Sequence, residues 1–191
     1  MGLFDSLFGG GTRLRSPASV RHGGKRLSEI LAAHQKYHSG DPGGVRANLE
    51  GADLSRVQLF EANLANALMA GCNLESAFIK KSKLAGADLS RANLRKVKIN
   101  NCDLTETKLV GSDLTEADLS GCELFRGDLT DAVVRNATLR GTVLRQTKLV
   151  NTDLTGSDMA LASVREVDLA TAKLDHADMT KAVVRDNVKS A

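Results

Sequence analysis

Carboxylates, histidines and cysteines are the residues of this chain whose types and spacing could support chemistry. Acidic side chains are so frequent and so regularly spaced that carboxylate pairs, the usual signature of acid–base catalysis, arise from the spacing alone. His34 and His38 lie one helical turn apart, as two metal ligands would, but no third ligand accompanies them. The sequence contains no phosphate-binding loop, dinucleotide fingerprint, nucleophile elbow or HExxH segment. We therefore expect a protein that is not an enzyme and binds no cofactor or metal, with both histidines on the surface of a helix.

The elements that position these side chains follow from a five-residue repeat. It runs in unbroken register through 28 units, from Ala47 to Asp186, and reads ADLSR at 52–56 and ADLSG at 117–121. Each unit has Leu, Met, Ile or Val at its centre and a small or β-branched residue two positions earlier, and the other positions are mostly polar. Two inward residues alternate with one outward residue, as in a strand, and the remaining two turn a corner. Such units stack into a solenoid in which each turn contacts only its neighbours.

The composition agrees with a narrow interior. Apolar residues make up 42% of the 191-residue chain, but aromatic residues only 3%, with five Phe, one Tyr and no Trp. Leu at the centre with Ala beside it leaves no room for rings in the core. We therefore expect the few rings on outward positions or in the flanking segments.

The repeated A(D/N)LXX sequence resembles the pentapeptide-repeat family over residues 47–186. The resemblance implies an all-β solenoid, a right-handed quadrilateral parallel β-helix with four units per coil. Twenty-eight units then correspond to about seven coils, roughly 34 Å long at about 4.8 Å per strand spacing. The family includes members that dimerise end to end, and members that mimic duplex DNA and bind gyrase or topoisomerase IV.

The chain divides into four expected segments. These are a leader (1–26), a capping helix with its connection (27–46), the repeat (47–186) and a short tail (187–191). We expect Ser28 to be the N-cap of a short N-terminal capping α-helix over about 29–38, ended by Gly40 and Pro42. The side chains expected to cover the first coil are Leu27, Ile30, Leu31 and Tyr37. The tail is too short for a second cap, so we expect the last coil to be covered by a second copy in a two-fold homodimer.

The leader has two competing interpretations. One is a flexible, disordered tail. The other is a membrane-surface contact, in which an apolar helix face precedes a basic tract; the face consists of Leu3, Phe4, Leu7 and Phe8. No apolar run is long enough to span a membrane, and no secretory signal is present. Because the family is largely bacterial, the expected location is the bacterial cytoplasm, with peripheral contact at the inner membrane surface.

The three cysteines are expected to fill the core. Cys72, Cys102 and Cys122 all occupy the small inward position of the repeat. If a coil has twenty residues, Cys102 lies directly above Cys122, but parallel inward side chains have poor geometry for a disulfide. An odd number of cysteines without a secretory signal also favours a reducing compartment.

Two kinds of outward residue are candidates for binding a partner. Arginines would stack near the C-terminal end: Arg145, Arg165 and Arg185, with Arg126 nearby. A row of like charges weakens a ladder, so it indicates an anionic partner, unless Glu166 and Asp186 neutralise it. Exposed rings are the other candidates: Phe60 and Phe78, with lysines alongside, and Phe125. A packed corner shielded by the N-terminal segment is the alternative for the first two. A further column alternates in the sign of its charge and is expected to fix the register between coils; it consists of Asp88, Lys108, Asp128, Lys148 and Asp168.

Charge discriminates between the possible functions. The chain carries a net charge of +3, but residues 47–191 contain 19 basic and 20 acidic residues. A rod that is nearly neutral is a poor substitute for DNA, and its mixed signs argue against direct nucleic-acid binding. The leading hypothesis is a non-enzymatic rigid scaffold that presents regular faces to protein partners. The alternative is a DNA-mimicking modulator of gyrase or topoisomerase IV.

Overall fold

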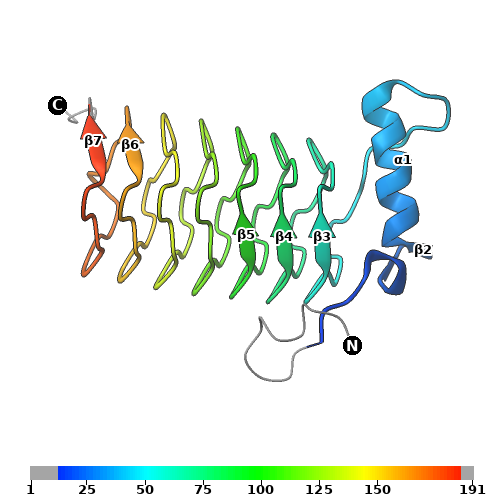
Figure 1. Ribbon diagram of the computed structural model, residues 1–191, viewed down its shortest axis with the longest axis horizontal. Coiled ribbons are helices and arrows are strands. Elements are labelled where there is room, and N and C mark those ends of the chain that lie inside the picture. Colours follow the sequence, from blue (N-terminus) through cyan, green and yellow to red (C-terminus); the bar gives the residue numbers. More distant parts are fainter. Residues whose placement is uncertain (1–12, 186–191) are drawn as a thin grey trace.

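A computed structural model describes residues 13–185 as a rod of stacked coils with one α-helix at its N-terminal end (Figure 1). The N-terminal elements are a 3₁₀ turn and a two-stranded antiparallel hairpin followed by the helix: η1 (Pro17–Ser19), β1 (Arg21–His22), β2 (Lys25–Arg26) and α1 (Leu27–Ser39). The assigned strands of the rod are β3 (Gln58–Phe60), β4 (Phe78–Lys80), β5 (Lys98–Asn100), β6 (Ser163–Arg165) and β7 (Val183–Arg185). No helix among the described residues is long and apolar enough to cross a membrane.

Parallel pairing between residues twenty apart builds the rod. Leu59 of β3 pairs with Ile79 of β4, which pairs in turn with Ile99 of β5. Isolated bridges continue the same offset between the assigned strands, from Asn48–Leu68 to Asp158–Asp178. Because four units of five residues bring the chain back to the same face, the repeat period is the cause of this register.

The polar positions of the repeat have structural roles at the corners of the coils. The Asp or Asn before each centre commonly accepts the backbone N–H two residues later, as Asp53 does from Ser55 at 3.1 Å. The residue two after a centre adopts a left-handed conformation almost throughout the rod, whether it is Gly51 or Arg56, and Thr171 is an exception. Type II turns require this conformation at their third residue, and a bond from the Ala52 N–H to the Leu49 carbonyl closes such a turn. The repeat therefore specifies its corners as well as its core.

The core is a single column of aliphatic and small side chains. Its members include Leu119 and Leu139, which are at most 1% exposed, and all three cysteines are buried within it as free thiols. Burial raises the pKa of the Cys72 thiol to about 12, which keeps it protonated and unreactive at neutral pH. At the C-terminal end the column opens, since Leu169, Leu174 and Met179 are only half-buried.

The helix α1 begins earlier than expected. Arg26, not Ser28, is the N-cap, and its backbone N–H donates to the Glu29 carboxylate at 2.8 Å. The predicted N-cap was wrong because the capping interaction comes from a glutamate three residues into the helix rather than from a serine hydroxyl. At the other end, Gly40 is in the left-handed conformation (φ 73°), as a C-terminal glycine should be.

The buried face of α1 also differs from the expected one. Leu27 joins the core, and Ile30 and Leu31 pack against it. His34, expected at the surface, is fully buried, whereas Tyr37, expected against the first coil, is 46% exposed. The Leu27, Leu31 and His34 positions follow the helical spacing of four and three residues, and Tyr37 falls beside this stripe. The buried position belongs to the imidazole because it bridges the backbone: the Ala47 N–H donates to Nδ1 at 3.0 Å, and Nε2 donates to the Ala65 carbonyl at 3.1 Å.

Residues 13–26 of the expected leader belong to the folded structure. Arg15 forms a parallel bridge with Val57 and so extends the sheet of β3. Val20 is fully buried in the core, and its carbonyl accepts the Leu27 N–H at 2.8 Å. The boundary expected at residue 26 therefore does not mark a structural break. A repeat-based division misses these contacts because they lie outside the five-residue register.

The His34 bridge predicts that the attachment of α1 depends on pH. Burial, His38 and Arg46 all lower the pKa of His34 below its ordinary 6.5, against the opposing effect of the Ala65 carbonyl. As pH falls, the unfolded chain takes up the proton first, so this stabilisation is complete above about pH 6.5 and declines below it. Protonation also removes the acceptor for the Ala47 N–H.

We expect hydrogen exchange of the Ala47 amide, corrected for its intrinsic pH dependence, to accelerate as pH falls from 6.5 to 5. We also expect it to be about tenfold faster in His34→Ala than in His38→Ala, given the cost of an unpaired buried donor. The fluorescence of Tyr37, whose ring stacks on His34 at 5.9 Å, reports the same titration in a chain without tryptophan. Equal protection of Ala47 in the two variants would contradict the bridge.

Candidate interaction surface

The regularly spaced carboxylates of the rod are occupied by structural interactions. Asp53 accepts its corner N–H and also pairs with Arg15 at 2.9 Å. Hydrogen bonds from Ser55, together with Arg15, lower the pKa of Asp53 despite its partial desolvation. A general acid needs a raised pKa, so these groups are suited to holding corners and neighbouring segments rather than to transferring protons.

Ion pairs connect neighbouring coils along the surface. Three of them join an arginine to the aspartate eighteen residues later: Arg95–Asp113, Arg135–Asp153 and Arg140–Asp158. The column of alternating charge is connected by successive β-bridges from Asp88 through Lys108 and Asp128 to Lys148. Within it, Lys148 Nζ lies 3.3 Å from the Asp128 carboxylate. Charge along most of the rod is therefore matched within the chain.

A different surface lies along one corner near the C-terminal end, and we call it the arginine ridge: Phe125, Arg126, Arg145, Arg165 and Arg185. Phe125, Arg145, Arg165 and Arg185 follow one another at the twenty-residue spacing of the coils. The guanidinium carbons of Arg126 and Arg145 lie 4.8 and 5.7 Å from the centre of the Phe125 ring, within the range of a cation–π interaction. Sequence reasoning placed Phe125 and the arginines in separate groups, and the structure brings them together.

Acidic residues pair with Arg126 and Arg145 of the arginine ridge. Glu166 accepts from Arg145 at 3.1 Å, and Arg126 lies 3.8 Å from Glu106. Gln146 also donates to the Glu166 carboxylate, and this bond, together with Arg145, lowers the pKa of Glu166.

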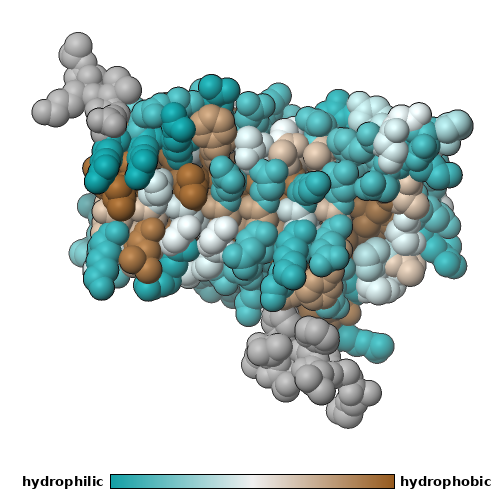
Figure 2. Space-filling model, turned by 45° about the horizontal axis from the view of Figure 1, so that its top comes forward, coloured by the Kyte–Doolittle hydropathy of each residue, from teal (hydrophilic) through white to brown (hydrophobic). Residues whose placement is uncertain are grey.

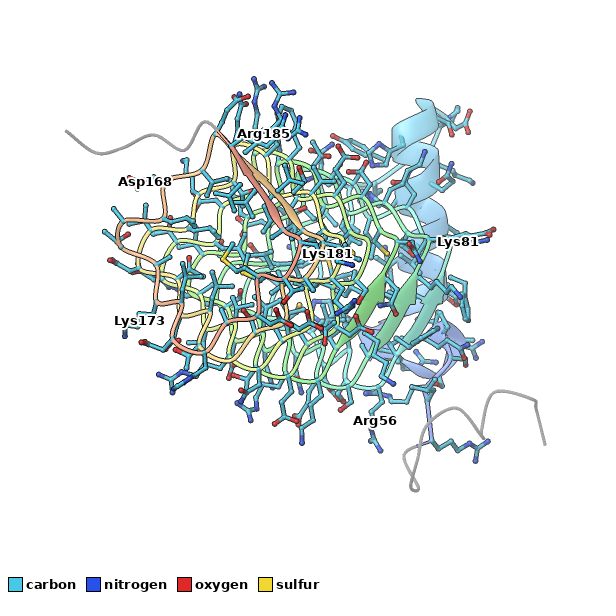
Figure 3. All side chains as sticks on the ribbon, turned by 60° about the vertical axis from the view of Figure 1, so that its left-hand side comes forward. Arg56, Lys81, Asp168, Lys173, Lys181 and Arg185 are labelled. Atoms are coloured by element: carbon cyan, nitrogen blue, oxygen red, sulfur yellow. The ribbon has the colours of Figure 1, made fainter. Side chains whose placement is uncertain are left out.

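The distal part differs. Arg165 of β6 pairs in register with Arg185 of β7, which places two like charges on adjacent strands. Arg165 forms no ion pair with any residue in the described range 13–185. Figure 3 shows Arg185 projecting from the rod on the side opposite Arg56.

The other predicted aromatic pair lies at the N-terminal end. Phe60 of β3 and Phe78 of β4 point outward, and their rings meet edge to face with centres 5.4 Å apart. Lys80 pairs in register with Phe60, and Lys98 with Phe78, so lysines do accompany the rings. The candidate membrane residues Leu3, Phe4, Leu7 and Phe8 lie outside the described residues.

The structure also reveals a basic hollow that sequence reasoning missed. It is lined by Arg13, Leu14, Arg15, Ser16, Ser19 and Arg56, with a volume of about 430 Å³. The bridge between Arg15 and Val57 brings the leader to this corner, and no periodic signal marks that contact. No cluster of three potential metal ligands occurs among the residues that the structure describes.

The stacked coils, parallel register and aliphatic column define a solenoid of the parallel β-helix type. The sequence matches the family described as pentapeptide repeats (8 copies) over residues 45–75, 69–109, 87–126 and 128–165. The chain belongs to the pentapeptide-repeat family, whose members fold as right-handed quadrilateral β-helices and are generally non-enzymatic structural or interaction modules. No protein of curated function has significant sequence similarity to the chain.

The chain is similar to several solved structures. QnrB1, a plasmid-mediated fluoroquinolone resistance protein, is 15% identical with a TM-score of 0.50, covering 72% of this chain and 79% of that one. HetL from the cyanobacterium Nostoc sp. strain PCC 7120, a pentapeptide-repeat protein involved in heterocyst differentiation regulation, is 23% identical with a TM-score of 0.37, covering 74% and 82%. Rfr23 from the cyanobacterium Cyanothece 51142 is 23% identical with a TM-score of 0.40, covering 72% and 88%. At these identities the likeness concerns the fold alone.

The diagonal ion pairs predict a difference between two aspartates at equivalent positions of the repeat. Asp153 has a side chain only 9% exposed and lies 2.6 Å from Arg135, whose hydrogen bond lowers the pKa of the carboxyl to about 2. The Asp158 side chain, which lies 3.2 Å from Arg140, is 35% exposed. We expect Asp153→Asn to lower the free energy of unfolding by about 1–2 kcal/mol at pH 7, and Asp158→Asn by less than about 1 kcal/mol.

Urea denaturation of both variants measures this difference. Asparagine retains the corner hydrogen bond, so the comparison isolates the charge. Because the pKa of Asp153 is lowered in the folded state, its contribution is complete above about pH 4 and is lost as pH falls towards 2. An effect of Asp153→Asn that stays constant from pH 7 to 2.5 would refute this account.

Proposed function

We propose that the protein is a non-enzymatic, rigid interaction module that binds an acidic protein partner along the arginine ridge. In this proposal residues 47–186 form about seven coils, α1 caps the first of them, and the rod is a scaffold that acts in the cytoplasm. The observation that carries it is the register of Arg165 with Arg185 on adjacent strands, one coil beyond Arg145, where Arg165 forms no ion pair within the range 13–185.

The physical argument rests on what like charges cost. Two arginines at neighbouring ladder positions repel each other, and this repulsion weakens the ladder. A carboxylate-rich partner would remove this repulsion, and Phe125 at the other end of the ridge adds an apolar contact already flanked by guanidinium groups. Aromatic residues and arginine are the types enriched where protein interfaces concentrate their binding energy.

Charge reversal within the arginine ridge tests the proposal. In pull-downs with the full chain, we expect Arg165→Glu to lose a partner that the unmodified protein retains, because repulsion replaces attraction at the ridge. Lys173→Glu is the matched control, since Lys173 is also exposed near the C-terminal end but lies on another side of the rod (Figure 3). The lost partner should be acidic and should elute with moderate salt. An identical set of partners for Arg165→Glu and Lys173→Glu would refute a role for the ridge.

We also propose that two copies join through their C-terminal coils. The apolar residues of the last coil are incompletely covered, with Val184 45% exposed and Met179 half-buried. The backbone N–H groups of Leu169, Leu174 and Met179 form no backbone hydrogen bond with another described residue. β7 lies at this end of the rod (Figure 1), and hydrophobic surface shows there between hydrophilic side chains (Figure 2). A two-fold, end-to-end contact would cover both surfaces.

Light scattering across a concentration series measures this association. We expect a dimer for the unmodified protein and a monomer for Val184→Lys, because the contact would bury two added charges. Leu161→Lys is the matched control, since Leu161 is an exposed apolar side chain on a corner of the same end (53% exposed). A monomer at all concentrations, or equal effects of the two variants, would overturn the proposed dimer.

The DNA-mimic alternative has weaker support. The balanced charge of residues 47–191 does not resemble the charge density of DNA. The likeness to QnrB1 concerns the β-helix itself, which many proteins of unrelated roles share.

A further inference from the structure

Basic residues outnumber acidic residues at the N-terminal end of the described structure. Residues 13–46 contain seven basic and two acidic residues, whereas the repeat is nearly balanced. One of the two acids, Glu29, is engaged by the Arg26 backbone at the start of α1. Net positive charge is therefore concentrated at the N-terminal end of the described structure, and the repeat that follows is nearly neutral.

The basic hollow defined above is the most concentrated part of this end. Backbone bonds hold its two sides together: the Arg15 N–H donates to the Arg56 carbonyl at 2.7 Å, and the Gln58 N–H donates to the Arg15 carbonyl at 2.9 Å. Arg15 is further fixed by Asp53 and by the Ser55 hydroxyl at 3.4 Å. The walls of the hollow are thus set by the fold rather than by mobile side chains alone.

The remaining two arginines are available to a ligand. Neither Arg13 nor Arg56 forms an ion pair with a residue between 13 and 185, in contrast to Arg15. Arg56 projects into solvent from its corner of the rod (Figure 3). The Ser16 side chain adds a hydroxyl donor to the lining, and Leu14 adds an apolar contact. The Ser19 hydroxyl also lines the hollow, but it donates to the Ser16 carbonyl at 2.8 Å.

This combination matches the chemistry of a phosphate group. Guanidinium groups bind phosphate oxygens through paired N–H donors, and hydroxyl groups can complete the set. A volume of about 430 Å³ exceeds that of a phosphate ion, so the hollow has room for a phosphate with the group attached to it.

We propose that the basic hollow is a binding site for a phosphate group, with Arg13 and Arg56 as its principal ligands and Arg15 as the fixed wall. The phosphate can come from the headgroup of an anionic lipid or from free phosphate in solution. This site stands apart from the arginine ridge, since Arg56 and Arg185 lie on opposite sides of the rod (Figure 3).

A matched pair of arginines tests the site. Arg56 and Arg91 occupy the same position of the repeat, with φ of 56° and 58°, and only Arg56 lines the hollow. Arg56→Gln and Arg91→Gln therefore make the same change in charge and in corner conformation. The double variant Arg13→Gln/Arg56→Gln is compared with Arg91→Gln/Lys173→Gln, which removes two charges elsewhere. Thermal melts followed by circular dichroism verify that all four variants fold.

Two arms distinguish the sources of the phosphate. In the first, the full chain is floated with vesicles of phosphatidylcholine containing phosphatidylglycerol; in the second, inorganic phosphate is titrated by calorimetry at constant ionic strength. We expect Arg56→Gln to weaken binding about fivefold relative to Arg91→Gln, and the Arg13→Gln/Arg56→Gln variant to weaken it more than tenfold relative to its control.

A selective loss with vesicles alone assigns the site to a lipid headgroup, and a selective loss with inorganic phosphate assigns it to free phosphate. Losses in both arms support the shared chemistry. Equal binding of Arg56→Gln and Arg91→Gln in both arms, or no binding of the unmodified chain in either, overturns the proposal. A loss of the arginine-ridge partner in Arg165→Glu leaves this result unaffected, so the two proposals can fail separately.

Discussion

Backbone hydrogen bonds between residues nineteen and twenty-one apart hold each coil of this protein to the next in a twenty-residue register, and every other feature of the rod depends on that register. The Leu119 N–H reaches the Thr138 carbonyl, and the Asp118 N–H reaches the Val97 carbonyl, both at 2.8 Å. The ladder stacks aliphatic centres on one another and so excludes water from a column too narrow for aromatic rings. It also stacks the outward residues, so charged side chains twenty positions apart become neighbours on the surface and attract or repel each other. Burial and surface recognition are thus two consequences of a single spacing.

Much of the rod could be predicted from the sequence because its interactions are local and repeated. The inward centres and the buried cysteines follow from a period that never slips, and the parallel offset of twenty residues is what the resemblance to the pentapeptide-repeat family implies. The pairing of Arg165 with Arg185 follows from the same arithmetic. Predictions failed for residues outside the five-residue repeat, where its spacing gives no information. His34 is buried through bonds to the backbone of Ala47 and Ala65, and hydrophobicity does not identify such a position.

The candidate surfaces show the same division. The arginine ridge could be anticipated, although its contact with Phe125 required side-chain geometry. The basic hollow could not, because Arg15 reaches Arg56 across about forty residues through one bridge outside the register. A segment that joins a repeat from outside brings contacts that no periodic pattern encodes. The N-terminal segment of this chain accordingly contributed most of the differences between expectation and structure.

The four-sided coil has a consequence for how such a chain can change in length. Removing five residues from the middle of the rod would preserve every core contact in kind, yet it would turn all later side chains by a quarter of a revolution. The row formed by Arg145, Arg165 and Arg185 would then face a different direction relative to α1, with its own spacing intact. Removing twenty residues would instead shorten the rod and leave every face aligned. Insertions and deletions therefore act on this molecule as rotations or as translations, depending only on their length.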